Sequence, residues 1–213
     1  FPEHQSGSGF YRDLNLENAT TTTRYQVDDV TYTRTTFASF TDNVIIMHIK
    51  ASKANALNFT IAYNCPLVHK VNVQNDQLTV TCQGKEQEGL KAALRAECQI
   101  QVKTNGTLRP AGNTLQINEG TEATLYISAA TNYVNYQDVS ADESHRTSEY
   151  LKRAMQIPYE KALKNHIAYY KKQFDRVRLT LPTGKISQLE FPLWRHLSVC
   201  NVLWKGMIWR WQL

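Results

Sequence analysis

The chain has 213 residues, of which 42% are hydrophobic and 20% charged, and this is the composition of a globular protein of one or two domains. It excludes a disordered or collagen-like chain. No apolar run approaches the roughly 18 to 20 residues of a membrane-spanning helix, since the longest one, at residues 44–47, has the length of a strand. The chain starts at Phe1 without a charged and then apolar leader, so we expect that a signal peptide has been removed or that the start is missing.

The formal net charge of +5 is unevenly distributed. Residues 1–143 hold 11 basic and 15 acidic side chains, residues 144–178 hold 9 and 3, and residues 179–213 hold 4 and 1. A nucleic-acid-binding surface combines basic side chains with stacking aromatic side chains, whereas the main basic excess here falls in a stretch with helical periodicity. We therefore predict that the chain binds no nucleic acid.

From Tyr11 to about Thr131 apolar and polar residues alternate, with interruptions at Asn, Asp or Gly about every eight to twelve residues. The pattern predicts strands at residues 20–27, 30–39, 44–50, 57–63, 71–73, 78–82, 94–102, 115–117 and 123–129. It is clearest at 94–102, where the apolar side should face a core. The polar side there should face water: Arg95, Glu97, Gln99, Gln101 and Lys103. The fold is predicted to be mainly β, a large antiparallel β-sandwich.

The periodicity becomes helical after residue 139. Ser140 and Glu143 have the spacing of a capping box, which predicts a helix start. The first helix should place four apolar side chains on one face: Tyr150, Leu151, Ala154 and Met155. Pro158 fits the first turn of a second helix, whose apolar stripe consists of Leu163, Ile167, Tyr170, Phe174 and Val177. We predict that Leu163, Ile167, Tyr170 and Phe174 pack between domains.

Signatures of catalysis are missing from the sequence. It contains no H-E-x-x-H, C-x-x-C, G-x-S-x-G or Walker A motif, and its six His lack metal-ligand spacing. The acidic clusters are best explained as a turn at Asp28-Asp29 and as a helix N-terminus at residues 138–143. We predict no catalytic residue, no cofactor and no metal. Four cysteines, Cys65, Cys82, Cys98 and Cys200, are predicted to be small buried side chains rather than a disulfide framework.

Four segments together resemble one enzyme family. They are FYRDLNLENA at residues 10–19, VTYTR at 30–34 with FAS at 37–39, AATNY at 129–133 through Asp138-Val139, and HIAYY at 166–170 with FDRV at 174–177. Their order and spacing resemble glycoside hydrolase family 95, the α-L-fucosidases of bacteria and plants, over about residues 8–190. The resemblance implies an N-terminal β-sandwich, a helical linker, an (α/α)6 barrel that holds the active site, and a C-terminal β domain.

By this resemblance the chain comprises a sandwich at residues 1–139, incomplete at its N-terminal end, and a helical linker at 140–182. The family's opening segment has no counterpart before Phe1. Since the family's catalytic groups lie in the barrel, none is carried over, and we predict a fragment that is inactive alone. Its intact relatives remove terminal α-linked L-fucose from glycans, and the parent should be periplasmic or secreted. Its partners would be its own barrel and a fucosylated glycan, with no nucleic acid and no membrane.

Residues 183–213 form an anomalous tail, because all four Trp fall in the last twenty residues. Our hypothesis is a frameshift between about residues 181 and 192. If the codons for residues 204–213 are translated in a frame shifted back by one nucleotide, three positions must encode Glu, Asp and Ala. The other codons can be chosen so that the translated segment resembles the start of the family's barrel domain.

Two other functions remain open. One is a free-standing carbohydrate-binding module that uses Tyr133 and Tyr136, although packing in a core or interface is the expected role of both. The other is a membrane anchor formed by residues 203–213, with three Trp beside Lys205 and Arg210.

Overall fold

The computed structural model describes residues 1, 4–89 and 91–178, and residues 1–176 belong to one compact unit. The predictions made for the tail, including the frameshift, the Trp-rich anchor and Cys200, lie outside the described residues. Within the described part of the chain, neither helix is long and apolar enough to cross a bilayer.

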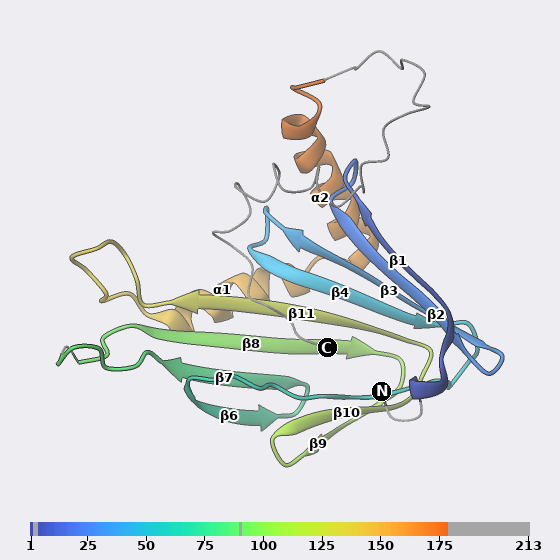
Figure 1. The fold of residues 1–213 in the computed structure, drawn as a ribbon, viewed down its shortest axis with the longest axis horizontal. Coiled ribbons are helices and arrows are strands. Elements are labelled where there is room, and N and C mark those ends of the chain that lie inside the picture. Colours follow the sequence, from blue (N-terminus) through green and yellow to red (C-terminus); the bar gives the residue numbers. More distant parts are fainter. Residues whose placement is uncertain (2–3, 90, 179–213) are drawn as a thin grey trace, which may run out of the picture. The chain divides into compact units, whose positions relative to one another are not determined.

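The described residues form two antiparallel sheets (Figure 1). The large sheet has eight strands in the order β1 (Ser8–Asn15), β2 (Thr20–Val27), β3 (Val30–Ser39), β4 (Val44–Ala51), β11 (Glu122–Thr131), β8 (Arg95–Thr104), β7 (Gln77–Gln83) and β6 (Val68–Gln74). The small sheet has three, in the order β5 (Leu57–Ile61), β10 (Thr114–Gly120) and β9 (Thr107–Ala111). A short 3₁₀ turn, His4–Ser6, precedes β1.

The main core lies between the two sheets. Alternate side chains of the central strands point into it, so Leu78 and Val80 of β7 are fully buried, as are Leu115 and Ile117 of β10. Strands with one face on a core and one face outside show a period of two in the sequence. The predicted mainly β fold, with its large antiparallel sheet and two following helices, is confirmed, although β1 and β9 were not among the predicted strands.

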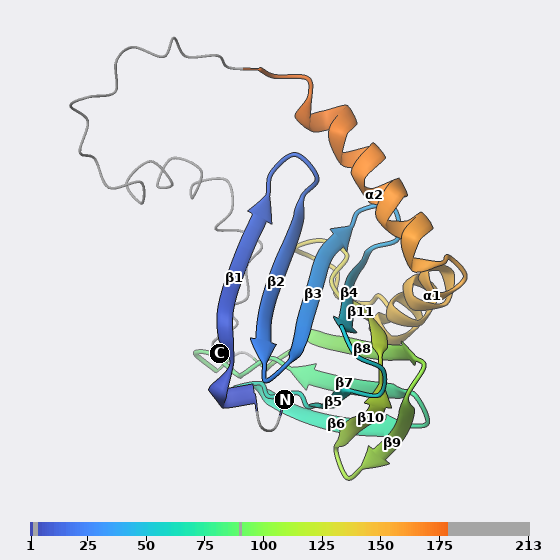
Figure 2. The same ribbon diagram turned by 90° about the vertical axis from the view of Figure 1, so that its right-hand side faces the viewer.

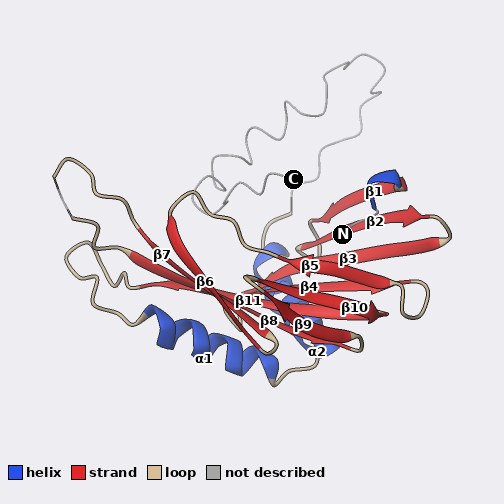
Figure 3. Cartoon of the chain, turned by 90° about the horizontal axis from the view of Figure 1, so that it is seen from below, coloured by secondary structure: helices blue, strands red, loops and turns tan. Residues whose placement is uncertain are grey.

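Helices α1 (Glu143–Met155) and α2 (Tyr159–Phe174) cover the opposite face of the large sheet (Figures 2 and 3). A second apolar cluster lies beneath them, in which Phe37, Ile46 and Tyr126 of the sheet meet Leu151 of α1 and Ala162 of α2. Helix α1 packs on β11 and β8, and α2 packs on β3. The large sheet is therefore buried on both faces in its middle.

This cover overturns one prediction. Glu97 and Gln99 of β8 do not face water, because α1 lies over them and leaves only 6% and 5% of their surfaces exposed. Their polar groups find partners there: Gln99 Nε2 donates to Glu97 Oε1 (2.7 Å) and to Ser148 Oγ (3.0 Å), and Thr147 Oγ1 donates to Glu97 Oε1 (3.0 Å). Buried polar groups are stable when they are bonded in this way.

The predicted capping box is also wrong. The N-cap of α1 is Asp142, whose carboxylate accepts a hydrogen bond from the backbone N–H of His145 at 2.9 Å. Ser140 lies before the helix, where its own N–H donates to Asp138 Oδ1 at 2.8 Å. The Glu143 carboxylate does not form the predicted bond of a capping box and makes an ion pair with Arg95 instead. An aspartate satisfies the free N–H groups of a helix start as well as a serine does.

Candidate functional site

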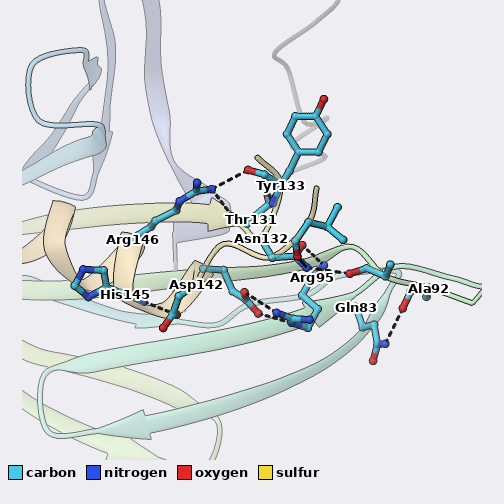
Figure 4. Close-up of polar contacts among 12 residues, drawn as sticks. Gln83, Ala92, Arg95, Thr131, Asn132, Tyr133, Asp142, His145 and Arg146 are labelled. Carbon is cyan, nitrogen blue, oxygen red and sulfur yellow. Dashed lines mark hydrogen bonds and ion pairs between the residues drawn. The ribbon is translucent and has the colours of Figure 1, made fainter. Parts of the chain in front are cut away.

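Residues 132–142, which connect β11 to α1, form a loop that the body of the domain holds firmly (Figure 4). Asn132 is fully buried at its base. Its Oδ1 accepts from the N–H of Arg95 (2.8 Å), and its Nδ2 donates to the carbonyls of Ala93 (3.0 Å) and Val139 (2.8 Å). One amide side chain thus joins the start of β8, the end of β11 and the far end of the loop.

Two arginines hold the same region from outside. Arg146 of α1 donates through Nη1 to the carbonyls of Thr131 (2.9 Å) and Tyr133 (2.8 Å). Arg95 makes two bonds to Glu143, Nε to Oε1 at 2.7 Å and Nη2 to Oε2 at 3.3 Å (Figure 4). This hydrogen bonding lowers the pKa of the Glu143 carboxyl. The loop is tied at both ends and at one internal carbonyl.

The loop presents apolar side chains to solvent. Tyr133 is 49% exposed and Tyr136 is 85% exposed, so neither packs in the core of the described residues. Of the two expected alternatives to sugar binding, packing in a core is wrong, and packing in an interface stays a prediction. Val134 beside them is also exposed. Aromatic rings held on a rigid loop offer a flat apolar surface for a protein partner or for the C–H face of a sugar.

Helix α2 seats one side of its apolar surface on the sheet. Of the four residues predicted to pack between domains, Leu163 contacts the second apolar cluster. Tyr170 Oη donates to the carbonyl of Leu16 at 2.7 Å, and its ring stacks on Phe174, with ring centroids 5.2 Å apart. Phe174 itself is 41% exposed, and Ile167 is half-buried. None of the four meets a second domain among the described residues, so their interdomain role stays a prediction.

The two residues of α2 that are buried are Ala162 and His166, and neither belongs to the predicted apolar stripe. The His166 ring stacks on Phe37, with centroids 4.8 Å apart, and its Nε2 lies 3.1 Å from both Asn18 O and Ala19 O. Because two carbonyls face this nitrogen, it carries the proton and donates to them. Ala162 and His166 are four residues apart, which places them on one face of a helix, and this spacing was the signal in the sequence that could have indicated their burial.

Several acidic side chains of the described residues have structural partners. Besides Asp142 at the helix start and Glu97 under α1, Asp42 accepts from Ser39 Oγ at 2.5 Å. The carboxyls of Asp29, Asp138 and Glu143 have lowered pKa values, chiefly through hydrogen bonds from Lys53, Ser140 and Arg95. A glycosidase general acid needs a raised pKa instead. Across residues 1, 4–89 and 91–178, no group of three or more His, Cys, Asp or Glu could hold a metal ion.

The cysteines of the described residues, Cys65, Cys82 and Cys98, are free and half-buried. Cys82 and Cys98 pack against the main core, in line with the prediction of small apolar side chains. Burial raises the pKa of the Cys98 thiol to about 12, so this group stays protonated at neutral pH.

A family model described as "Glycosyl hydrolase family 65, N-terminal domain" matches residues 1–136. The chain is also 25% identical over 201 residues to Alpha-L-fucosidase 2 of Arabidopsis thaliana, and this alignment covers 82% of the chain and 24% of that protein. The chain therefore spans about a quarter of the length of this curated relative.

Two solved structures are similar in part. One, assigned as a kojibiose phosphorylase from the human microbiome, has 13% identity and a TM-score of 0.48, and the match covers 76% of this chain and 22% of that chain. The other is a family GH92 α-mannosidase from Bacteroides thetaiotaomicron, with 10% identity, a TM-score of 0.34, and coverage of 80% and 23%. Both TM-scores lie below 0.5.

Proposed function

The chain belongs to the family of glycosyl hydrolase family 65 N-terminal domains, and from this premise we propose that it is the non-catalytic sandwich and linker of a larger α-L-fucosidase. This match confirms the prediction that the chain is the N-terminal β-sandwich domain of a glycoside hydrolase. The observation that carries the finer proposal is the similarity to Alpha-L-fucosidase 2. It covers 82% of the chain, so it extends beyond residue 136 into the helical region.

The proposed absence of catalysis is supported by the state of the acidic groups. Glycoside hydrolysis needs two carboxyl groups that face a sugar, one of them with a raised pKa. The carboxyls with shifted pKa values in the described residues are shifted downward and are engaged with neighbouring side chains or backbone. In this proposal the cleaving groups belong to another domain of the parent enzyme, which removes terminal α-linked L-fucose from glycans.

The proposed role of this domain is to support that catalytic domain. The outer side of α2 presents Ile167 and the exposed ring of Phe174. The loop at residues 132–142 presents Tyr133 and Tyr136. Partly exposed apolar side chains on rigid elements are typical of contacts between domains of one chain. The parent is proposed to be periplasmic or secreted.

A fucosidase assay tests the proposal directly. The purified chain, incubated with 4-nitrophenyl α-L-fucoside and with 2′-fucosyllactose, should release no product above the buffer rate. Turnover that copurifies with the chain through two chromatographic steps would refute a non-catalytic role. The coding DNA from codon 175 onward, translated in three frames, tests the frameshift hypothesis: a shifted frame that continues into a long helical domain supports it, and no such frame contradicts it.

A second candidate is a free-standing carbohydrate-binding module. The specific observation in its favour is the exposure of Tyr133 and Tyr136 on a loop held by Asn132 and Arg146. If the double variant Tyr133→Ala and Tyr136→Ala lost an oligosaccharide affinity that the wild type possesses, this function would be preferred.

A further inference from the structure

We infer that the groove between α1 and strands β7 and β8 is a binding site for a neutral oligosaccharide. This inference rests on the proposed function, since it adds a glycan contact to a domain of a glycan-cleaving enzyme. The site lies on the helix-covered face of the large sheet and is distinct from the loop that carries Tyr133 and Tyr136.

The groove is open to solvent and has a volume of about 460 Å³, which is within the range of small-molecule sites. Its floor consists of three glutamines on adjacent strands, Gln77 of β7 with Gln99 and Gln101 of β8. Its wall is α1, which contributes Ser148, Leu151, Lys152, Met155 and, just after the helix, Gln156. Lys152 is the one formal charge in this lining, and no carboxylate lines the cavity.

The floor retains unused hydrogen-bonding groups. Gln99 is more than nine-tenths buried, and its Nε2 donates hydrogen bonds to Glu97 and Ser148. These bonds fix the side chain, and its Oε1 remains available as an acceptor. Gln101 Nε2 donates to Asp76 Oδ2 at 3.0 Å, and no bond within the described residues engages its Oε1. The complete amide of Gln77 has no partner among the described residues. The site therefore offers fixed acceptors beside free amides that can both donate and accept.

The polar character of the floor continues towards the edge of the sheet. In register with Gln77 and Gln101 lies Gln74 of β6, and in register with Gln99 lie Thr79 of β7 and Asn72 of β6. These two rows consist of amides and hydroxyls, and charged side chains, Lys70 and Glu97, appear only in the next row along the strands. Amides and hydroxyls match ligands that present hydroxyl groups, because both partners can donate and accept.

A neutral sugar fits this chemistry. Each of its hydroxyls donates and accepts, as the amides do, and vicinal hydroxyls can reach both atoms of one planar amide. The C–H face of a pyranose ring needs an apolar contact, which Leu151 and Met155 supply in the wall. Lys152 is the one charged side chain in the lining, and the nearby ammonium group of Lys103 already donates to the Met155 carbonyl at 2.6 Å, so the lining favours an uncharged ligand.

The test is a titration of the nitrogen-15-labelled full chain with 2′-fucosyllactose, followed by NMR of the glutamine side-chain amides. We expect the amide signals of Gln77 and Gln156 to shift with a dissociation constant in the millimolar range. The variants Gln77→Leu and Gln156→Leu should each weaken binding by about fivefold, the usual worth of one net hydrogen bond. The matched control is Gln83→Leu, on the same face of β7 about 20 Å away, which should change the affinity less than twofold.

Three results would overturn the inference. They are the absence of any shift at 50 mM sugar, equal shifts with glycerol at the same hydroxyl concentration, and shifts confined to the loop of Tyr133 and Tyr136. None of these affects the proposed non-catalytic role, because that role fails only through turnover in the fucosidase assay. Conversely, a catalytic chain that still binds sugar at Gln77 would refute the proposed function and leave this site standing.

Discussion

Replacing Asn132 by alanine should loosen the loop between β11 and α1 and destabilise the whole domain. The side chain is fully buried and makes three hydrogen bonds, with the N–H of Arg95 and the carbonyls of Ala93 and Val139. Each bond contributes about 1 kcal/mol net, and each group left unpaired in a buried place costs about 1 to 3 kcal/mol. We therefore expect the free energy of unfolding to fall by about 3 kcal/mol or more, a drop in Tm of about 6 to 12 °C for a domain of this size.

Urea unfolding followed by circular dichroism measures this loss, and amide hydrogen exchange locates it. The N–H of Arg95, which donates to Asn132 Oδ1, should exchange faster in the variant than in the wild type. A matched control is Asn72→Ala on β6, where the exposed amide has no side-chain bond among the described residues. It should change stability by less than about 0.5 kcal/mol.

Asn132→Asp sharpens the test, because the acid keeps the acceptor for Arg95 and loses both donors. At neutral pH its carboxylate would be buried against two carbonyl oxygens, so the loss should exceed that of the alanine variant. Burial raises the pKa of such a carboxyl above its ordinary value in the folded state, so the deficit relative to the wild type should shrink as the pH falls. If Asn132→Ala lowered the free energy of unfolding by less than about 1 kcal/mol and left amide exchange at Arg95 unchanged, the role of Asn132 in holding this loop would be refuted.

Three further outcomes are expected. His166→Ala should cost about 2 kcal/mol and speed amide exchange along α2, since the ring stacks on Phe37 and bonds two carbonyls; unchanged exchange in α2 would contradict this. Arg95→Ala should destabilise the domain only slightly, because its ion pair with Glu143 lies near the surface. Arg95 lowers the pKa of Glu143 in the folded state. The variant's loss in free energy of unfolding should therefore be complete above the ordinary Glu pKa of about 4.3 and should vanish as the pH falls through the lowered pKa. Unfolding curves at pH 7 and pH 3 measure this change. The Cys98 thiol, with a pKa raised by burial to about 12, should react with DTNB at pH 8 far more slowly in the native chain than in denaturant, and equal rates would count against its burial.

The alternation of residues predicted most strands because one face of each central strand lies on the core between the sheets. It could not predict which outer faces a helix would cover. Glu97 is buried by a contact with Thr147, 50 positions away, and its polar side chain resembles that of any solvated strand. β9 escaped prediction because it is short, contains Pro110 and has an irregular burial pattern.

The candidate site was less predictable than the fold. Asn132 follows a strand and precedes a loop, where asparagine is a common turn residue, so the sequence does not indicate that it is buried and bonded to three segments. Tyr133 and Tyr136 were identified as the close aromatic pair outside strands and helices, and the structure adds their exposure. The groove beside α1 combines residues from two strands and a helix, an arrangement that only the packing of α1 on β8 creates.

The contacts of α2 with the first hairpin have a consequence for the order in which the protein is made. His166 bonds to Asn18 across 148 positions, and Tyr170 bonds to Leu16 across 154. At about 5 to 20 residues per second, the ribosome needs about 7 to 30 s to add the 148 residues that separate the first pair. The β1–β2 hairpin therefore emerges long before the helix that fastens its tip, and its exposed edge depends on chaperones or on rapid sheet formation during that interval.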